Sequence, residues 1–189
     1  MSSVLILASA SPRRRELMDL TGIPYEVDAP GVDETCDLPA RETVGVLSRR
    51  KAEAAKRAHP DRPVLAADTL VAVDGHALGK PADEDEAFRM LRSLSGRAHQ
   101  VYTGVCVIAA DGRVFSGIDT SEVIFDEMTD EEILSYIRTG EPMDKAGSYA
   151  LQGMASLWVR EVRGSPSGII GLPMHLTGKL LADAGITPF

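Results

Sequence analysis

Residues 4–17 read VLILASASPRRREL, an apolar run followed by small residues and then by basic ones. We expect a buried strand at Val4–Ala8, with Ser9 at its C-terminal end. Ser11 and Pro12 favour a helix start, because serine is a preferred N-cap and proline fits the first helical position. A strand, a turn and a helix in this order leave free backbone amides at the helix N-terminus. The segment therefore predicts a phosphate-binding turn.

Helical and strand patterns alternate along the rest of the chain. Apolar residues three and four apart predict a helix at Pro39–Ala58, whose inner stripe is Ala40, Val44, Leu47, Ala54, Ala55 and Ala58. The other predicted helices are Asp83–Leu94, Thr129–Arg138, Leu172–Ala184 and the one that Pro12 opens, with Leu17, Met18 and Leu20 on its apolar side. The predicted strands are Tyr25–Val27, Val64–Asp68 with its continuation Thr69–Val73, Val101–Ala109, Val114–Phe125 and Leu157–Val162. Mixed helices and strands of this kind predict an α/β fold.

Composition excludes several classes of protein. The 189 residues are 44% hydrophobic and 25% charged, which is ordinary for a globular chain. A net charge of −8 and an aromatic content of 5% disfavour nucleic-acid binding. Cys36 and Cys106 are too few and too far apart to indicate a disulfide framework or a thiolate metal site. Since no apolar run approaches the length of a membrane span, we expect a soluble, cytoplasmic protein.

Charged residues in apolar surroundings are the candidates for chemistry. Asp68 follows an apolar run, so we expect it at a strand end, where ligands bind in open α/β sheets. Lys51 lies on the apolar stripe of its helix, where a lysine must reach solvent or meet a partner. Lys80 and Glu34 lie in loops, and each taken alone is an ordinary surface charge. Two carboxylates with several cations nevertheless fit a magnesium–polyphosphate site.

Short motifs follow one another along nearly the whole chain: Leu5–Arg14, Val32–Glu34, Arg50–Ala52, Ala66–Thr69, Gly79–Pro81, Leu94–Gly96, Val101–Gly104, Asp144–Tyr149, Gln152–Gly153 and Gly171–Pro173. In combination they resemble the Maf family, a group of nucleoside triphosphate pyrophosphatases once linked to septum formation. The resemblance implies a mixed twisted sheet with flanking helices, in two lobes around a nucleotide-binding cleft. It also implies one domain over residues 1–189, and a homodimer as a family-level expectation.

The resemblance further implies a reaction and its residues. The reaction would cleave a nucleoside triphosphate between its α- and β-phosphates, giving the monophosphate and pyrophosphate. Asp68 would be the proton acceptor that activates water, and Asp68 and Glu34 would hold a divalent cation, Mg²⁺ or Mn²⁺. The triphosphate would be neutralised or gripped by Lys51, Lys80, Ser9 and Arg14.

Three positions imply the preferred base: Arg13, Thr69 and Gln152. This combination resembles the branch of the family that acts on dTTP and UTP, whereas a tryptophan in place of Arg13 would resemble the branch acting on 7-methyl-GTP. A glutamine amide donates and accepts at once, and so can match the O4 and N3–H edge of a pyrimidine. Taken alone, Gln152 could equally bond the backbone of its own loop.

Two other functions remain open at this stage. The chain could be a pyrophosphatase for another base, or a nucleotide sensor that regulates cell division without turnover. The complete set of Asp68, Glu34, Lys51 and Lys80 favours catalysis, because a sensor has no need for a carboxylate that activates water. The sequence indicates a nucleotide partner, and neither nucleic acid nor a membrane.

Overall fold

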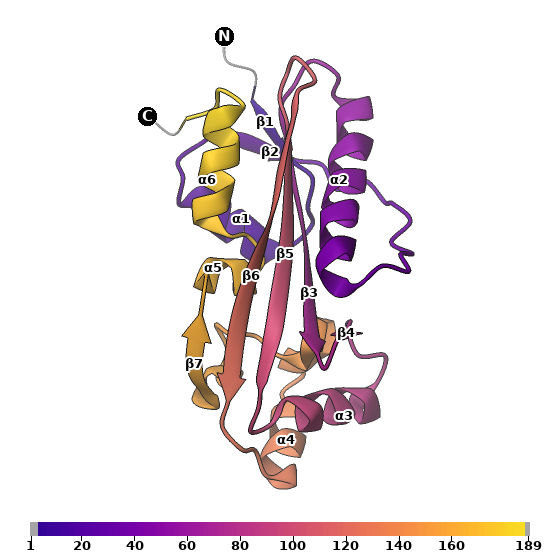
Figure 1. The fold of residues 1–189 in the computed structure, drawn as a ribbon, viewed down its shortest axis with the longest axis vertical. Coiled ribbons are helices and arrows are strands. Elements are labelled where there is room, and N and C mark those ends of the chain that lie inside the picture. Colours follow the sequence, from indigo (N-terminus) through magenta and orange to yellow (C-terminus); the bar gives the residue numbers. More distant parts are fainter. Residues whose placement is uncertain (1–3, 188–189) are drawn as a thin grey trace.

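The computed structural model describes residues 4–187, and one mixed sheet runs through this part of the chain (Figure 1). Its strand order is β2-β1-β3-β5-β6-β7, with β4 paired to β3 off this path. The strands are β1 (Leu5–Leu7), β2 (Tyr25–Val27), β3 (Val64–Val73), β4 (His76–Leu78), β5 (Ala98–Ile108), β6 (Val114–Phe125) and β7 (Val159–Arg163). β1 is parallel to β2 and β3, whereas the other pairs are antiparallel. The α/β prediction with a mixed sheet is confirmed.

Helices flank this sheet at both ends of its long strands. They are α1 (Pro12–Asp19), α2 (Ala40–Ala58), α3 (Glu84–Leu94), α4 (Asp130–Ile137), α5 (Pro166–Ile170) and α6 (Met174–Asp183), with 3₁₀ turns η1 (Glu141–Asp144), η2 (Ala146–Ser148) and η3 (Met154–Leu157). α1, α2 and α6 lie at one end of β3, β5 and β6, and α3 and α4 lie at the other (Figure 1). Among the described residues, no helix is both long and apolar enough to cross a membrane.

The two ends of the sheet have separate apolar cores, which defines two lobes. In the lobe of α3 and α4, Leu91 and Phe125 belong to one buried cluster. In the lobe of α1, α2 and α6, the sheet is covered on both faces. Leu7 packs with the residues of α1 and α6, while its neighbour Ile6 packs on the opposite face with α2. Such alternation is what a strand buried on both faces requires.

At the ends of the helices the structure confirms some local predictions and corrects others. Ser11 takes the N-cap position of α1, but its side chain makes no capping hydrogen bond. Leu20 is 77% exposed, because α1 ends one residue earlier. Along α2 the buried line runs through Ala52 and Ala55, so that Ala54 is only partly buried and Ala58 is exposed.

Short elements account for most of the other differences. The sequence patterns do not indicate α5 or the three 3₁₀ turns, which are too short to show a period. β7 begins at Val159 because Leu157 belongs to η3, and α6 begins at Met174 with Pro173 as its N-cap. Asp74 and Gly75 form the tight β3–β4 turn, both with positive φ, as is typical of an Asp-Gly pair in a hairpin.

Candidate active site

A cleft opens at one edge of β3, between the two lobes. β1 pairs with this edge only as far as Leu65, and β4 joins the same edge at Val71. β5, by contrast, pairs with the opposite edge of β3 from Val64 to Ala72. The stretch around Asp68 therefore has a strand neighbour on one side only. Thr69–Val73 continues the strand as predicted, so Asp68 lies in the middle of β3 and the expectation of a site at a strand end is wrong. The site arises instead because the parallel neighbour β1 stops early.

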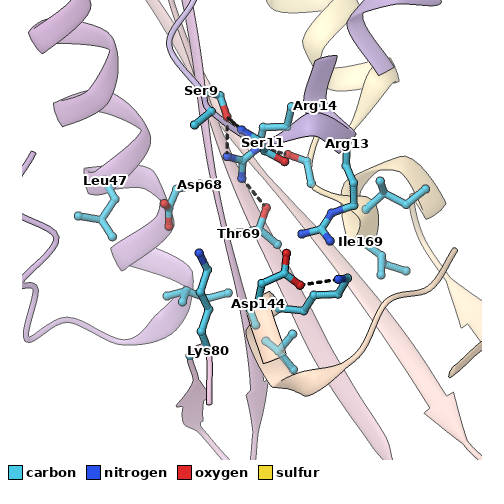
Figure 2. Close-up of a pocket in the computed structure, with 18 of the residues that line it drawn as sticks. Ser9, Ser11, Arg13, Arg14, Leu47, Asp68, Thr69, Lys80, Asp144 and Ile169 are labelled. Carbon is cyan, nitrogen blue, oxygen red and sulfur yellow. Dashed lines mark hydrogen bonds and ion pairs between the residues drawn. The ribbon is translucent and has the colours of Figure 1, made fainter. Parts of the chain in front are cut away.

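The cleft brings together every side chain that the sequence singled out. Its volume is about 1220 Å³. The predicted residues that line it are Ser9, Arg13, Arg14, Glu34, Lys51, Asp68, Thr69, Lys80 and Gln152. They come from the β1–α1 turn, α1, the loop before α2, α2 itself, β3, the loop after β4 and the turn before η3. Figure 2 shows Ser9, Arg13, Arg14, Asp68, Thr69 and Lys80 around the cleft.

Lys51 joins the two predicted carboxylates. Its Nζ lies 2.6 Å from Oδ1 of Asp68 and 2.7 Å from Oε1 of Glu34. The Lys51 side chain is 17% exposed and that of Asp68 10%, whereas that of Glu34 is 62% exposed. Helix α2 can lie this close to the sheet because Gly104 of β5 has no side chain, and a Cβ there would collide with the carbonyl oxygen of Val44. The lysine on the apolar stripe thus meets a partner.

The environment of Asp68 sets its proton affinity. Burial raises the pKa of the Asp68 carboxyl, and the positive charges of Lys51 and Arg14 offset part of this shift. The nearby charge of Glu34 raises the Asp68 pKa further. A carboxylate with a raised pKa accepts a proton more readily than a solvated one. The geometry and electrostatics suit Asp68 to the role of a general base.

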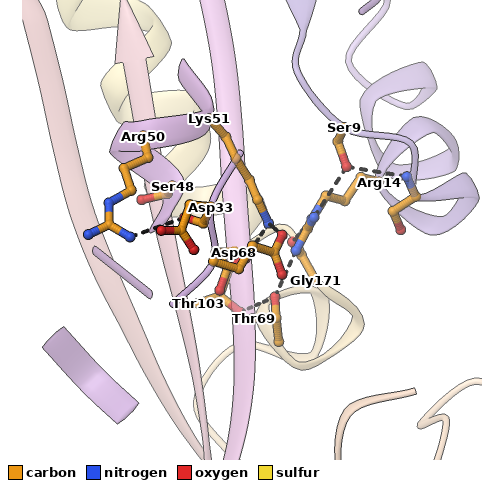
Figure 3. A network of polar contacts seen from close by, with 12 residues as sticks. Ser9, Arg14, Asp33, Ser48, Arg50, Lys51, Asp68, Thr69, Thr103 and Gly171 are labelled. Carbon is orange, nitrogen blue, oxygen red and sulfur yellow. Dashed lines mark hydrogen bonds and ion pairs between the residues drawn. The ribbon is translucent and has the colours of Figure 1, made fainter. Parts of the chain in front are cut away.

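Arg14 links three parts of the cleft wall. Its Nε donates to the carbonyl of Gly171 at 2.7 Å, its Nη1 to Oγ of Ser9 at 3.2 Å and its Nη2 to Oγ1 of Thr69 at 3.1 Å (Figure 3). A guanidinium has five N–H donors, so two remain for a ligand. Ser9 Oγ also accepts from the Ser11 amide at 3.3 Å, which leaves its own proton free to donate.

The hydroxyl of Thr69 is used within the protein. It lies 2.9 Å from Oγ1 of Thr103, which in turn donates to the carbonyl of Gly168 at 2.8 Å. Because the proton of Thr103 goes to that carbonyl, Thr69 is the donor to Thr103 and the acceptor from Arg14. Thr69 therefore holds Arg14 in its place at the cleft wall.

The lobe of α3 and α4 supplies the opposite rim. Figure 2 shows Lys80 pointing toward Asp68, and Arg13 facing Asp144. Lys145 donates to Asp144 Oδ1 at 2.5 Å, and this bond, together with the charge of Arg13, lowers the pKa of Asp144.

The side chain of Gln152 stands apart from this network. It is exposed and lines the cleft. Within residues 4–187 its amide has no hydrogen-bond partner, so it does not bond the backbone of its own loop. The amide is thus available to a ligand.

Arg50 is a site residue that the candidate set missed. Its Nη1 donates to the carbonyls of Asp33 and Thr35, at 3.1 and 2.8 Å, and so brackets Glu34 (Figure 3). Asp33 Oδ1 also accepts from the Thr35 amide at 2.9 Å. These contacts fix a loop that has no regular structure of its own. Two signals in the sequence point to Arg50: its position beside Lys51 and its place in the Arg50–Ala52 motif of the resemblance.

The donor set at the centre of the cleft fits a divalent cation in part. Among residues 4–187 there is no group of three or more His, Cys, Asp or Glu side chains placed to hold a metal by themselves. Asp68 and Glu34 nevertheless offer two hard oxygen donors on either side of Lys51 Nζ. Mg²⁺ is commonly bound by one or two carboxylates together with substrate phosphates. The residues present therefore fit a cation that arrives with, or is completed by, a phosphorylated ligand.

A sheet-edge cleft with two carboxylates around a lysine, and with further basic side chains nearby, defines an α/β protein with a site for a polyanion. Comparison with known proteins narrows this class. The sequence profile described as Maf-like protein matches residues 4–184, and the chain belongs to that family.

Relatives in three organisms carry the same name. The chain is 46% identical over 187 residues to a dTTP/UTP pyrophosphatase of Bacillus pumilus, covering 98% of both chains. It is 46% identical over 177 residues to one of Thermococcus gammatolerans, covering 94% and 95%. It is also 46% identical over 187 residues to one of Deinococcus radiodurans, covering 98% of this chain and 95% of the relative.

A solved structure supports the fold. That of a HAM1 protein from Coxiella burnetii matches 97% of this chain and 100% of its own, with a TM-score of 0.53 and 14% identity. At this identity the likeness concerns the fold alone.

Proposed function

We propose that this chain is a nucleoside triphosphate pyrophosphatase that hydrolyses dTTP and UTP to the monophosphate and pyrophosphate. The observation that carries the proposal is the buried Asp68–Lys51 pair, with Glu34 beside it, in a cleft lined by further basic side chains. The names of the relatives in three organisms support the same reaction and the same bases.

In the proposed reaction the triphosphate lies along the cleft. Ser9 and the N-terminus of α1 bind phosphate oxygens through O–H and N–H donors, and Arg14 adds its two remaining N–H groups. Lys51 and Lys80 offset the negative charge of the phosphates. Asp68 accepts a proton from the water that attacks the α–β phosphoanhydride, and pyrophosphate leaves.

We also propose that Asp68 and Glu34 hold a divalent cation, Mg²⁺ or Mn²⁺. Such a cation would offset phosphate charge and polarise the phosphorus–oxygen bonds. Lys51 lies between the two carboxylates, so it keeps both oxygens close together before substrate arrives.

The base is assigned to the other rim of the cleft. Gln152 donates and accepts hydrogen bonds at the pyrimidine edge. Arg13, on α1 of the other lobe, faces Asp144 of this rim (Figure 2). Thr69 contributes indirectly, because its hydroxyl accepts a hydrogen bond from Arg14 and holds that side chain in place. We further propose that the protein works in the cytoplasm as one domain over residues 1–189, as a homodimer, with a nucleotide and neither nucleic acid nor a membrane as its partner.

A panel of nucleotides tests the proposed function. Pyrophosphate release is measured from dTTP, UTP, CTP, 7-methyl-GTP and pseudo-UTP, with Mg²⁺, Mn²⁺ or EDTA. We expect release to be strongest with dTTP and UTP and to stop in EDTA. Release from another base would keep the chemistry and overturn the base preference. Binding of nucleotides without any release would favour the sensor.

A further inference from the structure

The turn that carries Gln152 is held by a carboxylate from outside the turn. The amide of Met154 donates to both oxygens of Glu141, at 3.1 and 3.2 Å. Gly153, between Gln152 and Met154, passes so close to this carboxylate that a Cβ would collide with it. The backbone can reach Glu141 only because position 153 has no side chain.

A buried tyrosine fixes the carboxylate in turn. The Tyr136 hydroxyl donates to Oε1 of Glu141 at 2.7 Å, and it accepts from the amide of Ala150 at 3.3 Å. Tyr136 lies on α4 and is fully buried. Burial and the charge of Glu141 raise the pKa of the Tyr136 hydroxyl, which keeps its proton for this bond. Tyr136 and Glu141 therefore hold the chain on both sides of Gln152.

We propose that Glu141 is a positioning residue that sets the preference for the base through Gln152. This inference rests on the proposed function and deepens it. Both oxygens of Glu141 already accept hydrogen bonds from the protein, so Glu141 acts on the substrate through the turn. The Gln152 amide has no partner of its own within residues 4–187. Its position is consequently only as well defined as the backbone that carries it.

The test compares variants that loosen the turn with variants that preserve it. Glu141→Ala removes the acceptor for Met154 N–H, whereas Glu141→Gln keeps an acceptor oxygen. Gly153→Ala displaces the turn with Glu141 intact. Glu131→Ala, at an exposed acid on α4, is the matched control. The readouts are kcat/KM for UTP and for CTP, and the rate of amide hydrogen exchange over residues 150–155.

The proposal predicts a specific result for each variant. Glu141→Ala and Gly153→Ala lower the UTP-to-CTP ratio of kcat/KM roughly tenfold, as loss of a base-edge contact would. Glu141→Gln keeps most of the ratio, and Glu131→Ala keeps all of it. Glu141→Ala adds little to Gln152→Ala in a double-mutant cycle, because the two act as a unit. Exchange at Met154 becomes faster in Glu141→Ala.

Two results overturn the proposal. One is an equal fall of kcat/KM for UTP and for CTP in Glu141→Ala. The UTP-to-CTP ratio would then be unchanged, which is what a purely structural residue would give. The other is unchanged exchange at Met154. A wild-type protein without any base preference would instead contradict the proposed function. The exchange measurement would then decide by itself whether Glu141 positions the turn.

Discussion

Lys51 Nζ lies 2.6 Å from Oδ1 of Asp68, and both side chains are largely buried at the wall of the cleft. Burying either charge without the other would be costly, so the pair explains how an inward lysine and a mid-strand aspartate are tolerated. The same pair controls the protonation of Asp68, because burial raises its pKa and Lys51 is the largest opposing influence.

Removal of this lysine should change the pH dependence of turnover. In Lys51→Met the pKa of Asp68 loses the influence that lowers it, and so it rises further. The base must be deprotonated to accept a proton. As the pH is lowered, Lys51→Met therefore loses activity at a higher pH than the wild type does. We expect the acid limb of the kcat/KM profile to lie at higher pH in Lys51→Met than in the wild type. An acid limb that stays in place would show that Asp68 is not the titrating base.

Arg50 should affect turnover through Glu34. Arg50→Ala frees the loop that carries Glu34, and a misplaced side chain of this kind costs on the order of 100-fold in rate. Arg49→Ala is the matched control, since within residues 4–187 Arg49 forms an ion pair only with Glu53 of the same helix, at an exposed position. Steady-state kinetics of the two variants check this prediction. Equal effects of the two substitutions would show that the hydrogen bonds from Arg50 to the residues on either side of Glu34 have no functional consequence.

Gln152 should separate base preference from phosphate binding. Gln152→Ala removes an amide that lies in the cleft without a protein partner, so the fold should be unaffected. We expect the preference for dTTP and UTP to fall more than the affinity for pyrophosphate, because Ser9, Arg14 and Lys51 bind phosphate from the opposite rim. Binding of both kinds of ligand by calorimetry, with kcat/KM for each base, measures the two effects. Unchanged selectivity among bases would make Gln152 a structural residue.

His99 gives a prediction for stability. It is fully buried, its Nε2 lies 2.8 Å from the Tyr149 hydroxyl, and its Nδ1 has no partner. Burial lowers its pKa to about 4 from the ordinary 6.5. The unfolded chain therefore binds a proton between these values and the folded chain does not, so stability is complete above pH 6.5 and falls as the pH drops toward 4.

The size of this loss is about 3 kcal/mol at full effect. Urea unfolding at pH 7 and pH 4.5 measures it. His99→Gln keeps a hydrogen-bonding group for Tyr149 but cannot titrate in this range. A variant that loses as much stability on acidification as the wild type would mean that other groups cause the loss.

The elements with a clear period could be read from the sequence. α2, α3 and the β5–β6 hairpin occur near their predicted bounds because their apolar spacing and turn residues are local signals. Likewise Lys51 stood out because it is a charge on an apolar stripe. The sequence does not show why the cleft opens beside Asp68 in mid-strand, because the end of β1 beside Leu65 is a long-range feature of strand pairing.

Contacts to backbone atoms explain the other omissions. Arg50 and Glu141 bind carbonyl and amide groups of distant segments, and such contacts leave no trace in residue type or spacing. The motifs of the resemblance contain Thr103, Gly153 and Gly171. These residues do not themselves bind the ligand but hold the residues that do. Their roles depend on close approach of segments that only the folded chain brings together.

The most direct test of the account is the product analysis of Asp68→Asn with UTP. The wild-type protein should form UMP and pyrophosphate in equal amounts. Asp68→Asn should lose roughly 10²- to 10⁴-fold in turnover, as expected for a missing general base, while it remains folded and still binds UTP. Full turnover in Asp68→Asn, or a wild-type protein that forms UDP and phosphate instead, would contradict the central claim.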